Sequence, residues 1–115
     1  MKLRVTPAAL QDMKDIKEYI SITLCNPAAA KRTVSNIISA YKKLTDSPFI
    51  GTSLRAKVDI DTPFRYLVSG NYLIFYQTND DHVDIHRIIY GKRDYIRILF
   101  DFETNDDEST EETAD

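Results

Sequence analysis

The sequence predicts a small α+β domain in which a helical hairpin packs on one face of a small antiparallel sheet. Two apolar stripes with helical spacing fall within residues 7–46, and three strand-like runs follow within residues 64–90. A Gly70-Asn71 pair separates the first two of these runs, as in a β-hairpin. The expected element order is β-α-α-β-β-β. One sheet face must carry the hairpin, because the two stripes need a surface to cover.

Residues 2–6 are predicted to form a short strand, followed by a helix over about 7–24. Thr6 before Pro7 is typical of a helix start, since threonine caps the free N–H groups and proline fits the first helical position. The stripe of this helix consists of Leu10, Met13, Ile16 (or Ile20) and Leu24.

Asn26-Pro27 repeats the start signal and predicts a second helix that ends before Ser47-Pro48. Its stripe consists of Ala30, Val34, Ile37, Ile38, Tyr41 and Leu44. Because only two or three residues separate the helices, they should pack as an antiparallel hairpin. Residues 47–63 are predicted to be a loop, and loops of this length tend to be functional or mobile.

Strands are predicted at 64–69, 72–78 and 82–90, as a meander to which the N-terminal strand is added. Tyr72 and Tyr76 are expected to be core aromatics. On the last strand, alternation places Asp84, His86, Ile88 and Tyr90 on one face and Val83, Ile85, Arg87 and Ile89 on the other. We expect the second set to face the helices. Residues 92–100 should form one or two helical turns or extend the sheet.

The charge is divided unevenly along the chain. The whole sequence has 15 basic and 18 acidic residues, but residues 1–100 hold all 15 basic and only 10 acidic residues, a net charge of +5. We therefore expect a domain over 1–102 and a disordered acidic tail over 103–115. A cationic domain suits a polyanion or an acidic protein partner, although the same charge also serves solubility.

Several function classes have no support in the sequence. Cys25 is the only cysteine and His82 and His86 are the only histidines, so we expect no disulfide framework, metal site or cofactor. No glycine-rich phosphate loop or nucleophile elbow is present. The N-terminus does not resemble a signal peptide, and the longest apolar run, residues 72–76, is too short to cross a membrane. A soluble cytoplasmic protein is expected.

The remaining candidates for chemistry are acid, base and cationic groups near the strands. His86 and Tyr90 could serve as general base and acid for attack of a ribose 2′-hydroxyl on the adjacent phosphate. Arg65 or Arg93 could stabilise the negative charge that develops there. The alternative is that His86 and Tyr90 are ordinary half-exposed strand residues, and that the basic pair beside Gly91 is a solvated turn.

Several segments together resemble the RelE/ParE superfamily of toxins from bacterial type II toxin–antitoxin modules, specifically its ParE-like branch. The resemblance covers about residues 3–100 and implies the fold predicted above. It is carried by Tyr19-Ile20, Ala30, Leu44, Pro48, Gly51, Arg65, Tyr72, Tyr76, Arg87-Ile88 and Gly91-Lys92-Arg93-Asp94.

The resemblance implies one of two mechanisms, because RelE-type members cleave mRNA in the ribosomal A site and ParE-type members inhibit DNA gyrase. RelE-like enzymes rely on lysines in the strand that corresponds to 64–69, on an arginine after the tyrosine of the next strand, and on an arginine in the glycine-lysine-arginine turn. Here the first strand has only Arg65, Leu73 follows Tyr72, and Arg93 alone matches. We expect gyrase inhibition without catalysis, with metal-free mRNA cleavage or a non-toxic binding module as alternatives.

The resemblance also implies partners and a binding surface. The expected partners are a cognate antitoxin and DNA gyrase, or the ribosome and mRNA in the alternative reading. The cationic segment would contact the target through Lys92, Arg93, Tyr95 and Arg97. The antitoxin is expected in hydrophobic grooves beside the hairpin and the sheet, with acidic side chains that complement the domain's positive charge.

Overall fold

A computed structural model describes residues 1–100 and has the predicted α+β architecture, with additional short elements. The predicted boundary at residue 102 and the predicted tail over 103–115 lie outside the described residues. The elements are β1 (Lys2–Val5), α1 (Pro7–Glu18), a π-helical turn (Tyr19–Thr23), α2 (Pro27–Lys42), a 3-10 turn (Lys43–Thr45), β2 (Thr52–Ser53), α3 (Leu54–Val58), β3 (Arg65–Ser69), β4 (Tyr72–Thr78), β5 (His82–Tyr90) and α4 (Tyr95–Phe100).

Both helix starts of the hairpin use the predicted caps. The Thr6 hydroxyl oxygen accepts a hydrogen bond from the Ala9 amide at 3.1 Å, and its hydroxyl donates to the His86 carbonyl at 2.8 Å. The Asn26 side chain accepts from the Ala29 amide at 3.1 Å, and a proline follows each cap. The first cap therefore also ties the start of α1 to the middle of β5.

The sheet has the strand order β1-β5-β4-β3-β2. Its pairs are antiparallel except that β1 runs parallel to β5, so the sheet is mixed rather than purely antiparallel. Because β1 pairs only with residues 82–85, the rest of β5 forms an edge beside α1. There the Asp12 carboxylate accepts a hydrogen bond from the Ile88 amide at 2.9 Å. A helix side chain thus satisfies a strand N–H that no neighbouring strand pairs.

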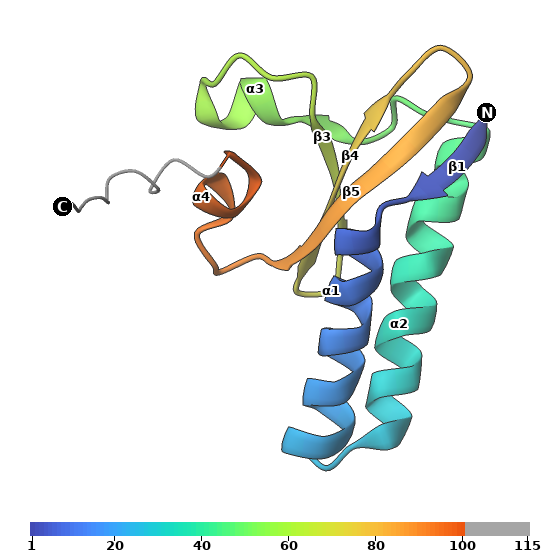
Figure 1. The fold of residues 1–115 in the computed structure, drawn as a ribbon, viewed down its shortest axis with the longest axis vertical. Coiled ribbons are helices and arrows are strands. Elements are labelled where there is room, and N and C mark those ends of the chain that lie inside the picture. Colours follow the sequence, from blue (N-terminus) through green and yellow to red (C-terminus); the bar gives the residue numbers. More distant parts are fainter. Residues whose placement is uncertain (101–115) are drawn as a thin grey trace, which may run out of the picture.

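The hairpin covers one face of the sheet and forms the larger core (Figure 1). Its stripes bury Ile16, Ile20, Ile37 and Leu44 against strand residues that include Tyr76. Two predicted members of the first stripe are not core residues: Leu10 and Leu24 are exposed. Ala9 is buried instead of its neighbour Leu10, whereas the predicted Ile16 and Ile20 are both core residues and Met13 packs against them.

The other face of the sheet carries a second core that the sequence did not predict. Residues 47–63 were expected to be a loop, but they contain β2 and α3, and Leu54 of α3 is fully buried. Within residues 92–100, a turn leads into the short helix α4 rather than into an extension of the sheet, and this helix lies on the same side as α3 (Figure 1). The buried residues of this second core are Leu54, Tyr66, Leu73, Phe75 and Ile89.

A β-bulge in β5 corrects the predicted face assignment. Phe75 pairs with Arg87 while Tyr76 pairs with Ile85, so His86 is an additional residue in the ladder. Val83 and Ile85 face the hairpin as expected, but after the bulge Ile88 faces the hairpin and Ile89 joins the second core. An inserted residue reverses the side of every following side chain, and simple alternation therefore fails after Ile85.

Candidate functional site

The basic turn lies between the end of β5 and α4. It is held by the backbone: the Gly91 amide donates to the Asn71 carbonyl at 2.8 Å, and the Arg93 amide donates to the Tyr90 carbonyl at 3.0 Å. The side chains of Lys92 and Arg93 are exposed. Within residues 1–100, neither side chain has a hydrogen bond or ion pair. Two cations are thus exposed side by side on an ordered backbone.

The other two predicted target-binding residues are on α4 and differ from each other. The Tyr95 ring lies 5.3 Å from the Phe75 ring, so Tyr95 helps to fasten α4 to the sheet. Arg97 is exposed, and its amide donates to the Asp94 carboxylate at 3.3 Å, which caps the start of α4. Lys92, Arg93 and Arg97 therefore remain candidates for direct contact with a target, while Tyr95 is partly used in packing.

The Arg65 side chain already binds backbone carbonyl groups of the same chain. Its guanidinium donates to the Gly51 carbonyl at 2.8 Å and to the Phe49 carbonyl at 3.4 Å, and it lies 5.2 Å from the centroid of the Phe49 ring. The Gly51 amide in turn donates to the Tyr76 hydroxyl at 2.9 Å. Burial raises the pKa of Tyr76, so this hydroxyl is neutral near pH 7. These contacts hold the 49–51 segment against the sheet.

His86 and Tyr90 lie on opposite faces of the sheet. The His86 ring is 4.8 Å from the Phe64 ring, which packs against the second core. Burial, and secondarily the Arg87 charge, lower the pKa of His86. Tyr90 instead makes an edge contact with Tyr72 at 5.9 Å between ring centroids, on the side of the hairpin.

The structure does not bring the four predicted nuclease residues together. Arg65 pairs with Tyr76 and Tyr90 pairs with Tyr72, so they are separated by four residues along β4. At the rise of a strand, Arg65 and Tyr90 are thus about 13 Å apart along the sheet. The predicted base His86 and the predicted acid Tyr90 lie on opposite faces, although an acid and a base that act on one phosphate both need to be within hydrogen-bond reach of it. Their catalytic roles remain a prediction that this arrangement does not favour.

The ion pair between Arg87 and Asp12 is a feature that sequence reasoning missed. The guanidinium donates to both carboxylate oxygens of Asp12, at 2.7 and 2.8 Å, and both side chains are mostly buried. Asp12 raises the pKa of Arg87 further. Alternation predicts only that Arg87 faces the helices. Its partner could not be identified, because an aspartate 75 residues earlier gives no local signal.

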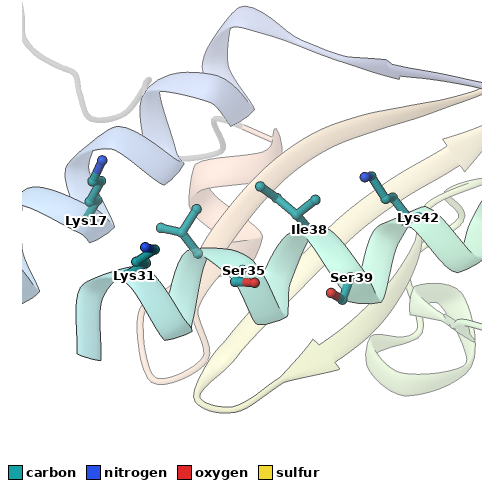
Figure 2. Close-up of a pocket in the computed structure, with 7 residues that line it drawn as sticks. Lys17, Lys31, Ser35, Ile38, Ser39 and Lys42 are labelled. Carbon is teal, nitrogen blue, oxygen red and sulfur yellow. The ribbon is translucent and has the colours of Figure 1, made fainter. Parts of the chain in front are cut away.

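A shallow groove with basic margins lies along α2 of the hairpin (Figure 2). Lys31 and Lys42 of α2 and Lys17 of α1 border it, and Val34 and Ile38 contribute its apolar floor. α2 contains three basic residues and no acidic residue. This one-sided charge of α2 is the sequence signal that indicates the groove.

Two further observations concern ligands and membranes. In the part of the chain that the structure describes, no group of three or more His, Cys, Asp or Glu residues is arranged to hold a metal ion. None of the helices within residues 1–100 is long and apolar enough to span a membrane.

Comparisons with known proteins agree with this architecture. A search of curated proteins finds no match. A solved structure described as a chromosomal ParDE toxin–antitoxin system from P. aeruginosa is similar, with a TM-score of 0.66 and 22% sequence identity. The similarity covers 78% of this chain and 95% of that chain, and at this identity it shows the fold alone. The family model described as ParE toxin of type II toxin–antitoxin system, parDE, matches residues 3–95. The chain therefore belongs to the ParE toxin family of type II toxin–antitoxin systems.

Proposed function

We propose that this protein arrests bacterial growth by binding and inhibiting DNA gyrase in the cytoplasm, and that a cognate antitoxin neutralises it. Membership of the family implies the antitoxin partner. The single observation that favours a binding mechanism over RNA cleavage is the separation of Arg65, His86 and Tyr90. Arg65 already makes two hydrogen bonds to backbone carbonyls, so its charge is not directed at an outside phosphate.

Lys92 and Arg93 are the proposed contacts with the target. Both are exposed on a turn that backbone hydrogen bonds hold in place. Two adjacent cations can act jointly on one carboxylate or phosphate, and arginine can do so with two parallel hydrogen bonds.

The groove of the hairpin is the proposed site for the antitoxin. Its apolar floor at Val34 and Ile38 would accept the apolar face of a helix, and Lys17, Lys31 and Lys42 would pair with acidic residues beside that face. The target and the antitoxin would then use different surfaces of the toxin. Charge reversal of Lys31 and Lys42 is expected to prevent neutralisation and to leave toxicity intact, whereas reversal of Lys14, which does not border the groove, should change neither.

The proposed function is tested with the purified wild-type chain in two assays. We expect inhibition of DNA supercoiling by gyrase and no cleavage of ribosome-bound mRNA. Cleavage in the A site with unaffected gyrase would instead establish the RelE-like mechanism. Normal growth of cells at confirmed soluble expression would favour a non-toxic binding module.

A double variant tests the proposed contacts. Replacement of Lys92 and Arg93 by Ala is expected to abolish growth arrest, while the matched exposed pair Lys42 and Lys43 can be replaced by Ala without loss of toxicity. Both double variants should keep the thermal midpoint of the wild type, because exposed substitutions change stability by less than about 0.5 kcal/mol. Full toxicity of the first variant would show that the basic turn is ordinary solvated surface.

A further inference from the structure

Three tyrosines, Tyr19, Tyr72 and Tyr90, lie in the region where the hairpin passes the end of the sheet. Tyr72 begins β4 and Tyr90 ends β5, and their rings touch at 5.9 Å in an edge geometry. Tyr19 directly follows α1 and lies seven residues after Asp12, about two helical turns further along the same face. Asp12 accepts a hydrogen bond from the Ile88 amide at 2.9 Å, and Ile88 is two residues before Tyr90, so this face of α1 runs beside the end of β5. The hairpin extends beyond the sheet at this position (Figure 1).

Much of this surface is apolar and exposed. Ile22 is 69% exposed, Tyr19 53% and Tyr90 39%. Tyr19 and Ile22 also line a hollow on α1 and the π-helical turn, together with Asp15, Glu18 and Thr23. A protein gains nothing in its own stability from exposing large apolar side chains, so their grouping marks an interaction surface.

The two margins of the surface carry opposite charges. Asp15 and Glu18 border the hollow on the side of α1. Lys92 and Arg93 lie at the other side, separated from Tyr90 only by Gly91, and the Arg93 amide donates to the Tyr90 carbonyl. A nucleic acid that approached the cations would bring its phosphates toward the two acidic residues. A protein surface that carries both basic and acidic groups can instead place an opposite charge against each margin.

We propose that Tyr19, Ile22, Tyr72 and Tyr90, hereafter the tyrosine surface, bind a protein target that inserts an apolar anchor between the acidic and the basic margin. The partner surface places a basic group opposite Asp15 and Glu18 and an acidic group opposite Lys92 and Arg93. Tyrosine suits this role, because its large, rigid ring contributes contact area with little loss of side-chain freedom. This inference rests on the proposed function in taking the toxic target as the partner. It adds three residues, Tyr19, Ile22 and Tyr72, that are far from the basic turn in the sequence.

The decisive comparison uses two exposed isoleucines. Ile22→Ser removes an apolar contact of the tyrosine surface, and Ile50→Ser is the matched control in the 49–51 segment, where Ile50 is 51% exposed. With purified gyrase, the combination of Ile22→Ser and Tyr19→Ala should weaken inhibition of supercoiling at least roughly 30-fold, the size of an interface hot spot. Ile50→Ser should stay within about twofold of the wild type. Circular dichroism and thermal unfolding identify folded variants, and Tyr90→Ala provides an independent second variant.

Removing the negative charges of the acidic margin distinguishes a protein partner from a nucleic acid partner. Asp15→Asn with Glu18→Gln should weaken binding to a protein of mixed charge and should strengthen binding to a polyanion. Stronger inhibition or toxicity in this variant would overturn the inference.

Each remaining outcome bears on either the function or the inference. If the wild type inhibits gyrase and folded variants of the tyrosine surface inhibit equally well, the inference is wrong and the proposed function stands. If the wild type arrests growth without inhibiting gyrase, and these variants lose the arrest, the gyrase proposal is wrong and the tyrosine surface binds another protein. A wild type that neither arrests growth nor inhibits gyrase overturns both.

Discussion

The two ends of the sheet use similar residue types for different purposes. At the Arg65 end, where β3 begins, an arginine, a glycine and a tyrosine are joined by hydrogen bonds. Arg65 donates to the Gly51 carbonyl, and the Gly51 amide donates to the Tyr76 hydroxyl. At the Tyr90 end, where β5 stops, an arginine, tyrosines and a glycine also occur, but the Lys92 and Arg93 side chains have no polar partner within residues 1–100. Residue type alone therefore does not identify a binding site. The two ends differ in whether their polar side chains already have hydrogen-bond partners within the fold.

The largest expected effect is the loss of stability caused by Gly51→Ala, which adds a methyl group at the Arg65 end. In Gly51→Ala the new Cβ would lie 2.5 Å from the Tyr76 hydroxyl oxygen and 2.7 Å from the Tyr66 carbonyl oxygen. Overpacking of this kind costs about 2–3 kcal/mol of unfolding free energy. At the Tyr90 end, Gly91→Ala would meet its nearest atom at 3.4 Å and should cost less than about 1 kcal/mol. Chemical denaturation measures both, and equal losses would contradict the proposed contrast between the ends.

A smaller effect is expected from removing one hydroxyl group at each end. Tyr76→Phe leaves the buried Gly51 amide without its acceptor, which should cost about 1–2 kcal/mol. Tyr72→Phe is the control, because the Tyr72 hydroxyl makes no hydrogen bond within the described residues. We expect its stability to match that of the wild type in urea titration. A loss in Tyr72→Phe as large as that in Tyr76→Phe would show that the Tyr90 end is also held by side-chain hydrogen bonds.

The two arginines should separate stability from toxicity. Arg65→Ala loses two hydrogen bonds to carbonyls and the contact with Phe49, at a cost of about 1 kcal/mol after allowance for its partial exposure. Growth arrest should persist below the thermal midpoint of this variant. Arg93→Ala should cost less than about 0.5 kcal/mol and should reduce toxicity. Loss of toxicity in a folded Arg65→Ala protein would instead restore Arg65 as a catalytic candidate.

The smallest expected effect is a pH dependence due to His86, which lies on β5 between the two ends. Burial lowers its pKa below the ordinary 6.5, so the unfolded chain binds a proton more readily than the folded protein does. The stabilisation from neutral His86 is thus present above about pH 6.5 and is lost as the pH falls through the interval down to the lowered pKa. His86→Phe should flatten this decline in thermal midpoint between pH 7 and pH 5. An unchanged decline would assign it to other groups, and His82→Asn provides the comparison.

Much of the fold was predictable because its signals are local. Thr6-Pro7 and Asn26-Pro27 start the two hairpin helices as predicted, and Gly70 takes a positive φ in the turn between β3 and β4. Four members of the second stripe, Ala30, Ile37, Tyr41 and Leu44, are buried as predicted, whereas Val34 and Ile38 are half-buried and line the groove. The partner of β1 was not predictable, because pairing between residues 2–5 and 82–85 depends on how the whole hairpin crosses the sheet.

The candidate site was predictable only in part. The sequence identified the exposed basic turn, but its grouping of His86 with Tyr90 depended on uninterrupted alternation along β5. One inserted residue at the bulge places these side chains on opposite faces. The tyrosine surface also escaped the prediction, since Tyr19 is 53 residues from Tyr72 in the chain and no periodic pattern connects them.

The sequence by itself thus determined the helical hairpin, the meander and the cationic turn, because each depends on residues within a few positions of one another. Tertiary structure decided which polar groups are already satisfied. Arg65 has hydrogen-bond partners because the fold places the Gly51 carbonyl beside it. Arg87 has a partner because α1 brings Asp12 to the edge of β5. Lys92 and Arg93 have no such partner among the described residues. Side-chain charge is encoded locally, whereas its neutralisation requires partners that only the folded chain brings within hydrogen-bond distance.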